Sequence, residues 1–400
     1  MFSPTTFKGG NIMKILWNSS SPLGVSGYGI CTRELVRRLI AEGHSVRIAT
    51  KHAYFGWHEW EGVEIFDGTH YKHVKFMLDD EDFDYIFSHW DIWVMKKERF
   101  PKDKWVGYIP VDTPKISDGL SKVVKDVGQL IGLSRHGQQQ LKEATGRDDI
   151  PYAPHGVDTS VFKPSAKARK AFRDGFGWDD DIFVIGTVGL NYVDDRKGFI
   201  TLLRAFKDFH KRYPKSVLYI HAHAMGYDNQ TIGYFDVIKS LGIADCVAWP
   251  HQPSYDLRRI DDEWLNEVYN GFDVFCLPTA GEGFGLPLIE AQACGIPVIT
   301  TDVTTGSELA GKTGWLIDVH EDDLDWINTG AWRYKRRPSE VLKCLELAHS
   351  AWKLGNYRKI KDKALAFGKS FDWDLIWDKY WRPVFKGLEA RLEDNGNDKD

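Results

Sequence analysis

The chain has 400 residues, of which 42% are hydrophobic, and a formal net charge of −5 at pH 7. This length exceeds one ordinary hydrophobic core and suits two α/β domains. The lack of a basic excess argues against a dedicated nucleic-acid binder, and no apolar run approaches the roughly 18 residues that a membrane crossing needs.

The first part of the chain has the pattern of a parallel α/β domain. A short strand predicted at 14–17 runs into a glycine-rich loop that contains Gly27, and helical spacing follows over 30–42. A second strand is predicted at 46–50. This order places the glycine-rich loop at the carboxyl end of the first strand, where ligands bind in parallel sheets.

A polar candidate follows the strand predicted at 105–109. Asp112 lies there in the sequence Pro-Val-Asp-Thr-Pro. A carboxylate at a reaction centre can steady a developing positive charge or orient a hydroxyl. The same residue fits an Asx turn before Pro114, and both interpretations stay open.

A pair of cations marks the start of the second half. The buried strand predicted at 182–188 leads into a loop with Arg196 and Lys197, directly before an amphipathic helix predicted at 199–213. Two cations at a strand-to-helix turn are well placed to neutralise a diphosphate. For this pair taken alone, a charged loop without a ligand is the alternative.

The histidines and cysteines do not predict a metal centre. His221 and His223 share one face of a strand predicted at 217–224, but a zinc site needs a third ligand of suitable spacing. The five cysteines are scattered and form no Cys-x-x-Cys pair. We interpret them as reduced core residues of a cytoplasmic protein.

The most informative stretch is a predicted strand, glycine-rich loop and helix. The strand at 273–277 leads into a loop with Gly283 and Gly285, and Pro287 lies in the first helical turn, where its missing N–H costs nothing. Glycines let a backbone approach a ligand closely. The start of a helix presents unpaired N–H groups and a partial positive charge, which suit a phosphate.

Two glutamates complete this stretch. Glu282 lies in the loop and Glu290 lies one turn into the helix. Carboxylates repel a phosphate, so beside a phosphate site they serve better as acceptors for sugar hydroxyls. The pattern predicts a ligand that has both a sugar and a diphosphate, and the alternative is an ordinary strand–loop–helix turn with two surface glutamates.

Glu282 and Glu290 are spaced as Glu-x7-Glu, and this stretch resembles the signature of retaining glycosyltransferases of the GT-B fold, most closely glycosyltransferase family 4. The resemblance extends from about Met13 to about Phe385. It includes His-Gly-Val-Asp-x-x-x-Phe at 155–162, which marks the end of the first domain in that family. The implied fold is α/β: a GT-B fold with two doubly wound Rossmann-like domains that face a cleft.

The same resemblance divides the chain. It implies an N-terminal acceptor-side Rossmann-like domain at 13–165 and a C-terminal nucleotide-sugar-binding Rossmann-like domain at 176–368. The helical pattern at 371–390 is expected to cross back to the first domain. Residues 1–12 and 391–400 are predicted to be a disordered leader and a disordered tail.

The resemblance also implies roles at the donor. Glu290 is expected to bind the ribose hydroxyls, and Glu282 the hydroxyls of the transferred sugar. Lys197, with Arg196, is expected to hold the diphosphate as it leaves. The predicted catalytic residues are Glu282, Lys197, Arg196 and Asp112. The predicted donor-binding residues are Glu290, Gly283, Phe284, Gly285, Leu286, Gly27, Trp249 and His251.

Several of these donor contacts come from backbone or aromatic groups. The backbone of Phe284 is expected at the sugar, and the N–H groups around Leu286 at the diphosphate. The loop of Gly27 resembles the first loop of family 4 enzymes, which faces the donor phosphates and the acceptor. Trp249 and His251 lie in the segment that contacts the base in the family, and either could stack on it.

The chain departs from the family at three places. The arginine that normally follows the strand glycine is replaced by Leu190, and Arg196 is the expected substitute. The histidine that the family often carries near the reacting sugar is absent, which leaves Asp112 as the nearest polar candidate, with His89 on the neighbouring loop. Residues 320–337 form an aromatic, charged insertion, interpreted as a surface loop or, as the alternative, a partner contact.

The resemblance implies transfer of a hexose from a UDP- or GDP-sugar to an acceptor hydroxyl with retention of configuration, without a metal or other cofactor. The acceptor is not identified by the resemblance: a glycan, a lipid-linked sugar and a small molecule all stay open, with DNA the least favoured, and so does peripheral contact with a membrane. A catalytically inactive nucleotide-sugar-binding module and a GT-B nucleotide-sugar epimerase are the alternative functions. Leu190 favours the inactive module, whereas the intact Glu282 and Glu290 argue against it.

Overall fold

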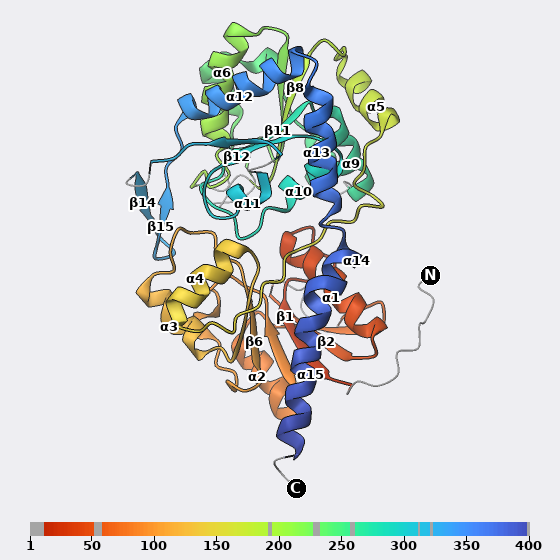
Figure 1. Ribbon diagram of the computed structural model, residues 1–400, viewed down its shortest axis with the longest axis vertical. Coiled ribbons are helices and arrows are strands. Elements are labelled where there is room, and N and C mark those ends of the chain that lie inside the picture. The colour runs from red at the N-terminus through yellow and green to blue at the C-terminus, as the bar shows by residue number, and fades with distance from the viewer. Residues whose placement is uncertain are drawn as a thin grey trace. The chain divides into compact units, whose positions relative to one another are not determined.

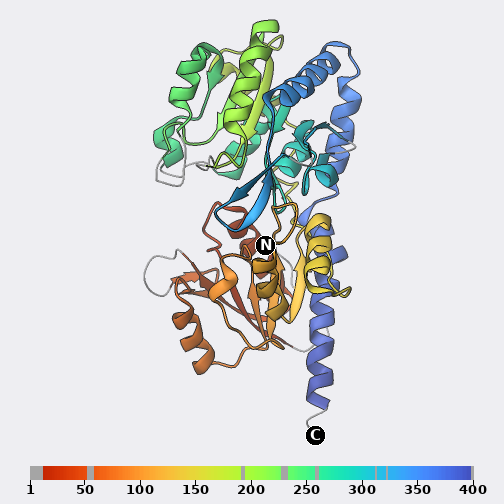
Figure 2. The same ribbon diagram turned by 90° about the vertical axis from the view of Figure 1, so that its left-hand side faces the viewer.

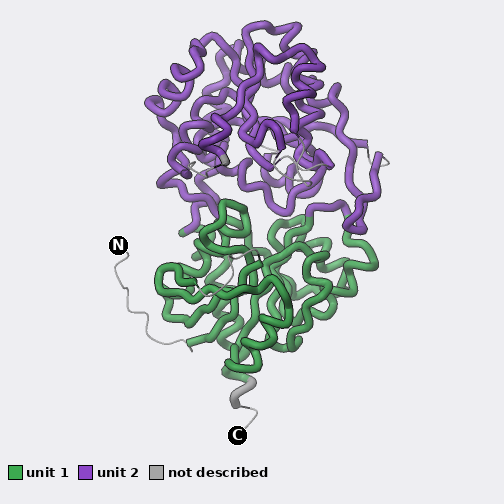
Figure 3. Tube along the Cα trace, turned by 180° about the vertical axis from the view of Figure 1, so that it is seen from behind, with its two compact units in different colours: residues 1–111, 115–155, 374–400 green, residues 112–114, 156–373 purple. Residues whose placement is uncertain are grey.

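The computed structural model describes residues 12–51, 58–190, 194–226, 233–256, 261–310, 313–320 and 323–397. The chain divides into two compact units (Figure 3). The first unit consists of residues 1–111, 115–155 and 374–400, and the second of residues 112–114 and 156–373.

The first unit is built on a seven-stranded sheet with the order β3-β4-β2-β1-β5-β6-β7 (Figure 1). Every neighbouring pair is parallel except β3 and β4. The strands are β1 (Lys14–Ser19), β2 (Ser45–Thr50), β3 (His58–Trp60), β4 (Val63–Asp67), β5 (Tyr85–Ser88), β6 (Trp105–Ile109) and β7 (Gln129–Gly132). All residues of β5 and β6 are buried, as expected for strands covered on both faces.

The helices of the first unit alternate with its strands, and a long helical segment at the C-terminus of the chain completes the unit. They are α1 (Gly27–Ala41), α2 (Tyr71–Asp80), a 3-10 turn (Met95–Lys97), α3 (Asp118–Asp126), α4 (Arg135–Thr145), α14 (Trp373–Ile376), one π-helical turn (Trp377–Trp381) and α15 (Arg382–Asn397). The C-terminal segment packs on this unit: the Trp381 indole donates to the Pro154 carbonyl at 3.1 Å, and the Tyr85 hydroxyl to the Leu388 carbonyl at 2.9 Å.

The predicted disordered tail is wrong for residues 391–397, which lie in α15. Phe385 and Leu388 anchor the helix by their burial, and the residues that follow, Ala390-Arg391-Leu392-Glu393, are good helix formers that let it continue. Residues 398–400, and the predicted leader up to residue 11, lie outside the described residues.

The second unit is built on a parallel sheet of six strands with the order β10-β9-β8-β11-β12-β13. The strands are β8 (Phe183–Val188), β9 (Ser216–His221), β10 (Val247–Ala248), β11 (Val274–Leu277), β12 (Val298–Thr301) and β13 (Trp315–Ile317). Numbered within the unit, this is the order 3-2-1-4-5-6 of a doubly wound fold, and β4-β2-β1-β5-β6-β7 repeats it in the first unit. The prediction of two doubly wound, Rossmann-like α/β domains is therefore confirmed.

Helices lie on both sides of the second sheet. They are α5 (Ala166–Phe176), α6 (Phe199–Arg212), α7 (Phe235–Leu241), a 3-10 turn (Ala244–Cys246), α8 (Gln252–Asp256), α9 (Asp262–Gly271), α10 (Leu286–Ala293), α11 (Gly306–Ala310), α12 (Pro338–Lys353) and α13 (Tyr357–Lys369). The pair α6 and α12 packs on one side and the pair α5 and α9 on the other (Figure 1). In the described part of the chain, no helix combines the length and the apolar character that a membrane crossing requires.

Within the insertion at 320–337, residues 324–334 form a β-hairpin where a surface loop was predicted, and the alternative of a partner contact stays a prediction. Strands β14 (Leu324–Ile327) and β15 (Ala331–Tyr334) pair antiparallel and extend from the body of the second unit (Figures 1 and 2). Trp326 and Trp332 are paired across the strands, with ring centroids 5.2 Å apart on the exposed face. Aromatic cross-strand pairs of this kind stabilise a hairpin that is otherwise short.

Candidate active site

The strand order of the second unit determines where its ligand site lies. In a sheet of order 3-2-1-4-5-6, ligands bind at the carboxyl ends of the two central strands, where the order reverses. Those strands are β8 and β11, which pair in parallel. The loop after β8 carries Arg196 and Lys197, and the loop after β11 carries Glu282.

Three of the predicted catalytic side chains meet at this point. The Lys197 Nζ lies 2.7 and 2.8 Å from the two carboxylate oxygens of Glu282. The Arg196 Nη1 lies 3.5 Å from Glu282 Oε2 and donates to the Gly281 carbonyl at 3.0 Å. The two loops are therefore joined by a carboxylate with two cations.

The ion pair of Glu282 and Lys197 is buried, because the two residues are only 6% and 9% exposed. This burial affects the pKa of both groups. Burial alone would raise the pKa of Glu282, but the neighbouring charges of Lys197 and Arg196 hold that pKa below its usual value. Burial lowers the pKa of Lys197, and the Glu282 carboxylate opposes that change. A buried pair of this kind is costly unless its charges are matched, so a ligand that displaces one partner has to bring a matching group.

A glycine brings the loop of Lys197 close to the start of the loop that carries Glu282. Gly198 has φ +77°, and a Cβ at this position would lie 2.1 Å from the Pro278 carbonyl oxygen. It is the residue directly before α6, and its neighbour Lys197 reaches Glu282.

Gly198→Ala should therefore destabilise the fold by roughly 2 kcal/mol, because left-handed backbone strain adds to a steric clash. Chemical denaturation would measure this loss. Gly175→Ala is the matched control, since its added Cβ meets no atom within 4 Å. Equal stability of the two variants would contradict the assigned role of Gly198.

The second predicted glutamate lies inside the helix that follows the glycine loop. Gly285, with φ +108°, precedes α10, and a proline occupies the first turn of that helix, as predicted. Glu290 is buried and accepts a hydrogen bond of 2.7 Å from the Tyr269 hydroxyl. Burial raises the pKa of Glu290 to about 7, although the bond from Tyr269 opposes the rise.

The loop backbone between the glutamates is held by threonines. The Glu282 N–H donates to the Thr304 hydroxyl at 3.0 Å, and the Thr305 hydroxyl donates to the Phe284 carbonyl at 2.5 Å. Gly283 is half-buried in this loop, and Leu286 begins α10. The backbone predicted to face a sugar is thus fixed before any ligand binds.

Asp112 belongs to the second unit and faces the same loops. Its Oδ2 lies 3.7 Å from Arg196 Nη1 and 3.5 Å from Arg333 Nη2. Its backbone carbonyl lies so close to Gly281 that an added Cβ there would approach it to 1.9 Å. Asp112 therefore lies beside Arg196 and the loop that carries Glu282, and its catalytic role stays a prediction.

Arg333, from β15, is a residue of this cluster that the sequence analysis missed. It is 7% exposed and donates through Nη1 to the Asp194 carboxylate. A signal for the hairpin was present: the turn Asn328-Thr329-Gly330, between two short aromatic runs, is a three-residue hairpin loop with glycine last. Gly330 has φ +86°, as such a loop requires.

The remaining predicted residues lie elsewhere. Trp249 follows the short edge strand β10 and packs on Phe235, with ring centroids 5.9 Å apart. His251 is exposed, and its Nδ1 lies 3.0 Å from the Ser254 hydroxyl. Gly27 lies in the first unit, where it begins α1 after the cap Ser26. The roles of these three residues stay predictions.

Within the described residues, one side-chain cluster has the composition of a metal site, and it is in the first unit. Cys31, His89 and His155 are buried, with ligand atoms all within 4.8 Å of one another. Burial lowers the pKa of both histidines, to about 3 for His155, so both are neutral. Their rings pack on Tyr108 at 4.5 and 5.8 Å between centroids. His221 is likewise neutral, with a pKa that burial lowers to about 3.

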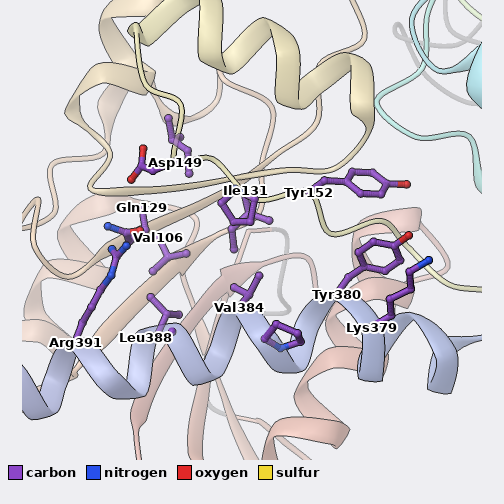
Figure 4. Close-up of a pocket in the computed structure, with 14 residues that line it drawn as sticks. Val106, Gln129, Ile131, Asp149, Tyr152, Lys379, Tyr380, Val384, Leu388 and Arg391 are labelled. Carbon is purple, nitrogen blue, oxygen red and sulfur yellow. The ribbon is translucent and has the colours of Figure 1, made fainter.

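A cavity of about 340 Å³ opens between α15 and the edge of the first sheet (Figure 4). Asp149 and Arg391 lie toward one end of it, and Tyr152 and Tyr380 toward the other. No predicted catalytic or donor-binding residue lines this cavity, so we place no part of the site there.

Part of the chain matches a known protein family. Residues 182–328 match the protein family described as "Glycosyl transferases group 1". A D-inositol 3-phosphate glycosyltransferase of Stackebrandtia nassauensis is 34% identical over 187 residues, which are 45% of this chain and 40% of that protein. A GDP-mannose-dependent alpha-(1-6)-phosphatidylinositol monomannoside mannosyltransferase of Mycolicibacterium smegmatis is 29% identical over 255 residues, 61% of this chain and 62% of that protein. The chain thus spans less than two thirds of these relatives.

Solved structures share the fold over nearly the whole chain. Sucrose-phosphate synthase from Thermosynechococcus elongatus has a TM-score of 0.72 at 19% identity, covering 95% of this chain and 100% of that one. Anabaena Alr3699/HepE in complex with UDP and glucose has a TM-score of 0.65 at 16% identity, covering 94% and 100%. At these identities the likeness concerns the fold.

Proposed function

We propose that this chain, which carries a glycosyl transferases group 1 domain on a GT-B fold, transfers a hexose from a nucleotide-diphosphate sugar to an acceptor hydroxyl with retention of configuration. The observation that carries the proposal is the buried contact of Lys197 with Glu282 at the carboxyl ends of the central strands. It brings a cation for a diphosphate and an acceptor for sugar hydroxyls to one point, next to the start of α10.

The diphosphate is the part of the donor that the cations serve. As the bond between the anomeric carbon and the diphosphate oxygen breaks, negative charge develops on that oxygen. Lys197, Arg196 and the N–H groups at the start of α10 stabilise this charge, because preorganised donors act on it in a site of low dielectric. This arrangement replaces a metal ion, so the reaction needs none.

The two glutamates bind the two sugar rings of the donor. Glu282 exchanges part of its contact with Lys197 for the hydroxyls of the hexose, beside the backbone of Phe284 and Gly285. Glu290 accepts hydrogen bonds from the ribose hydroxyls. A charged acceptor with fixed partners binds hydroxyl donors strongly, which orients the anomeric carbon.

Asp112 acts on the acceptor side. Its carboxylate is 30% exposed and faces the cations of the donor site, so it can orient the attacking hydroxyl or steady the positive charge of the sugar ring. The new bond to the acceptor oxygen forms on the face from which the diphosphate departs, and the acceptor proton passes to the departing phosphate.

The choice of first donors comes from the relatives. One relative is named as GDP-mannose-dependent, and a structural neighbour has been solved with UDP-glucose. We therefore propose a UDP- or GDP-hexose as donor, and a sugar, a lipid-linked sugar or a small polyol as acceptor.

The test is release of nucleotide from a panel of UDP-, GDP- and ADP-sugars, with and without EDTA. We expect release from one donor, unchanged by EDTA, and loss of that release in Glu290→Ala. Activity that disappears with chelator and returns with magnesium would contradict the metal-free mechanism. Cys31→Ser is the control for a metal in the first unit, because it removes one of the three side chains of that cluster.

Leu190, in place of the family arginine, favours one competing function, an inactive module that binds nucleotide sugars. Such a module would bind a donor in calorimetry and release nothing with any acceptor. Interconversion of the donor sugar without an acceptor would instead indicate the epimerase. Failure to bind any of the donors would overturn the proposed function.

A further inference from the structure

The hairpin β14–β15 has two different faces. Side chains alternate along a strand, and in β15 Ala331 and Arg333 are buried whereas Trp332 is exposed. The exposed face carries the pair Trp326 and Trp332, and the covered face presents one guanidinium group. A buried arginine is unusual and is expected to have a specific partner.

The Arg333 guanidinium is aimed at the candidate active site. Its Nη2 lies 3.5 Å from Oδ2 of Asp112, and Arg196 Nη1 lies 3.7 Å from the same oxygen. Two arginines from distant segments thus flank one carboxylate oxygen. The Arg333 Nε is buried and has no hydrogen-bond partner among the described residues, so one donor of this guanidinium is unsatisfied.

The hairpin is also tied to the loop that carries the cations. Arg333 Nη1 donates to Asp194, and Arg336 Nη2 donates to the Asp195 carbonyl and lies 3.4 Å from its Oδ2. Asp195 has φ +49°, and its carboxylate accepts from the Ile200 N–H at 3.1 Å, which holds the start of α6. Arg333 therefore has a fixed position relative to Arg196.

We propose that Arg333 is a ligand of the donor diphosphate, supplied by the hairpin to a site whose usual arginine position is occupied by Leu190. Without donor, the Asp112 carboxylate lies between Arg196 and Arg333, and the diphosphate takes its place beside the two arginines when it binds. The planar guanidinium suits this task, because its donors match phosphate oxygens in pairs. The inference rests on the proposed function and deepens it.

The experiment compares Arg333→Gln with Arg337→Gln. Arg337 is the matched control, because it follows the same hairpin, pairs with Asp323 and has a side chain that is 49% exposed. Calorimetry would measure the affinities for UDP, GDP and the corresponding monophosphates. We expect Arg333→Gln to weaken diphosphate binding by about 10- to 100-fold, as for a lost charged hydrogen bond, and to lower the ratio of diphosphate to monophosphate affinity. Arg337→Gln should change neither the diphosphate affinity nor this ratio.

Two further variants separate ligand contact from support of the fold. Asp112→Asn should raise diphosphate affinity several-fold, because it removes the competing carboxylate. Arg333→Lys keeps the positive charge but lacks the planar guanidinium. Its ratio of diphosphate to monophosphate affinity should therefore lie between those of Arg333→Gln and the wild type.

Two outcomes would overturn the inference. One is an unchanged ratio of diphosphate to monophosphate affinity in Arg333→Gln, including an equal loss of both affinities together with a lower Tm. The other is weaker diphosphate binding in Asp112→Asn. If the wild-type protein binds neither UDP nor GDP nor their sugars, the proposed function fails and the inference fails with it, whereas an unaffected Arg333→Gln refutes the inference alone.

Discussion

Lys197→Met should lower donor turnover by about 10²- to 10³-fold, because the departing diphosphate loses a cation that is aimed at its developing charge. The same change should destabilise the fold by about 3 kcal/mol, since removing one partner of a buried ion pair leaves the other charge uncompensated. That charge is the Glu282 carboxylate, which has a side chain 7% exposed and keeps a longer contact of 3.5 Å to Arg196. Nucleotide release and denaturant unfolding would measure the two effects.

The two effects can be separated with a second substitution. Lys197→Met combined with Glu282→Gln removes both charges, so the double variant should recover most of the stability and none of the turnover. Lys215→Met is the control on a surface pair, because its side chain is 73% exposed and bonds Asp181. It should change stability by no more than about 0.5 kcal/mol. If Lys197→Met were as active and as stable as this control, the ion pair would have no part in the site.

Lys197 and Glu282 were predicted for one site because the strands before their loops can be recognised in the sequence, although their direct contact was not predicted. Strands covered on both faces are short apolar runs, and the runs at 182–188 and 273–277 were predicted as such. Parallel strands share a carboxyl edge, so the loops after β8 and β11 had to meet once those strands were neighbours. Gly285 and Pro287 also indicated the start of α10. Glycine tolerates the positive φ before a helix and proline is favoured in the first turn, and both preferences are independent of tertiary packing.

Arg333 could not be anticipated, because its role depends on tertiary packing. Each strand of the hairpin has four residues, too few for alternation to be distinguished from chance, and its charges suggested a solvated loop. Only the folded hairpin shows which of its arginines is covered: Arg333 is buried, whereas the Arg337 side chain is 49% exposed. The helical tail at 391–397 was missed for a related reason, since polar composition does not reveal that a helix is anchored upstream.

The other large effect concerns Glu290, where stability and binding should depend on pH in opposite directions. Its folded pKa of about 7 lies above the usual value of 4.5 because of burial. The folded state therefore holds the proton more tightly, and this contribution to stability is present in full below pH about 4.5 and is lost as pH rises through about 7. Glu290→Gln mimics the protonated form and keeps an acceptor for Tyr269. It should match the wild type near pH 4.5 and exceed its stability by about 3 kcal/mol at pH 8.

Nucleotide affinity should show the opposite dependence, because ribose hydroxyls donate to the ionised carboxylate. The ionised fraction of a group with a pKa of about 7 rises about tenfold between pH 6 and pH 8, and the apparent affinity of the wild type should rise with it and level off above. Glu290→Gln should bind more weakly and lack this rise. The phosphate groups of the nucleotide titrate equally with both proteins, so the ratio of the two affinities isolates Glu290. A ratio that does not change with pH, from a variant that is nevertheless more stable at pH 8, would show that Glu290 is a buried carboxyl that the ribose does not contact.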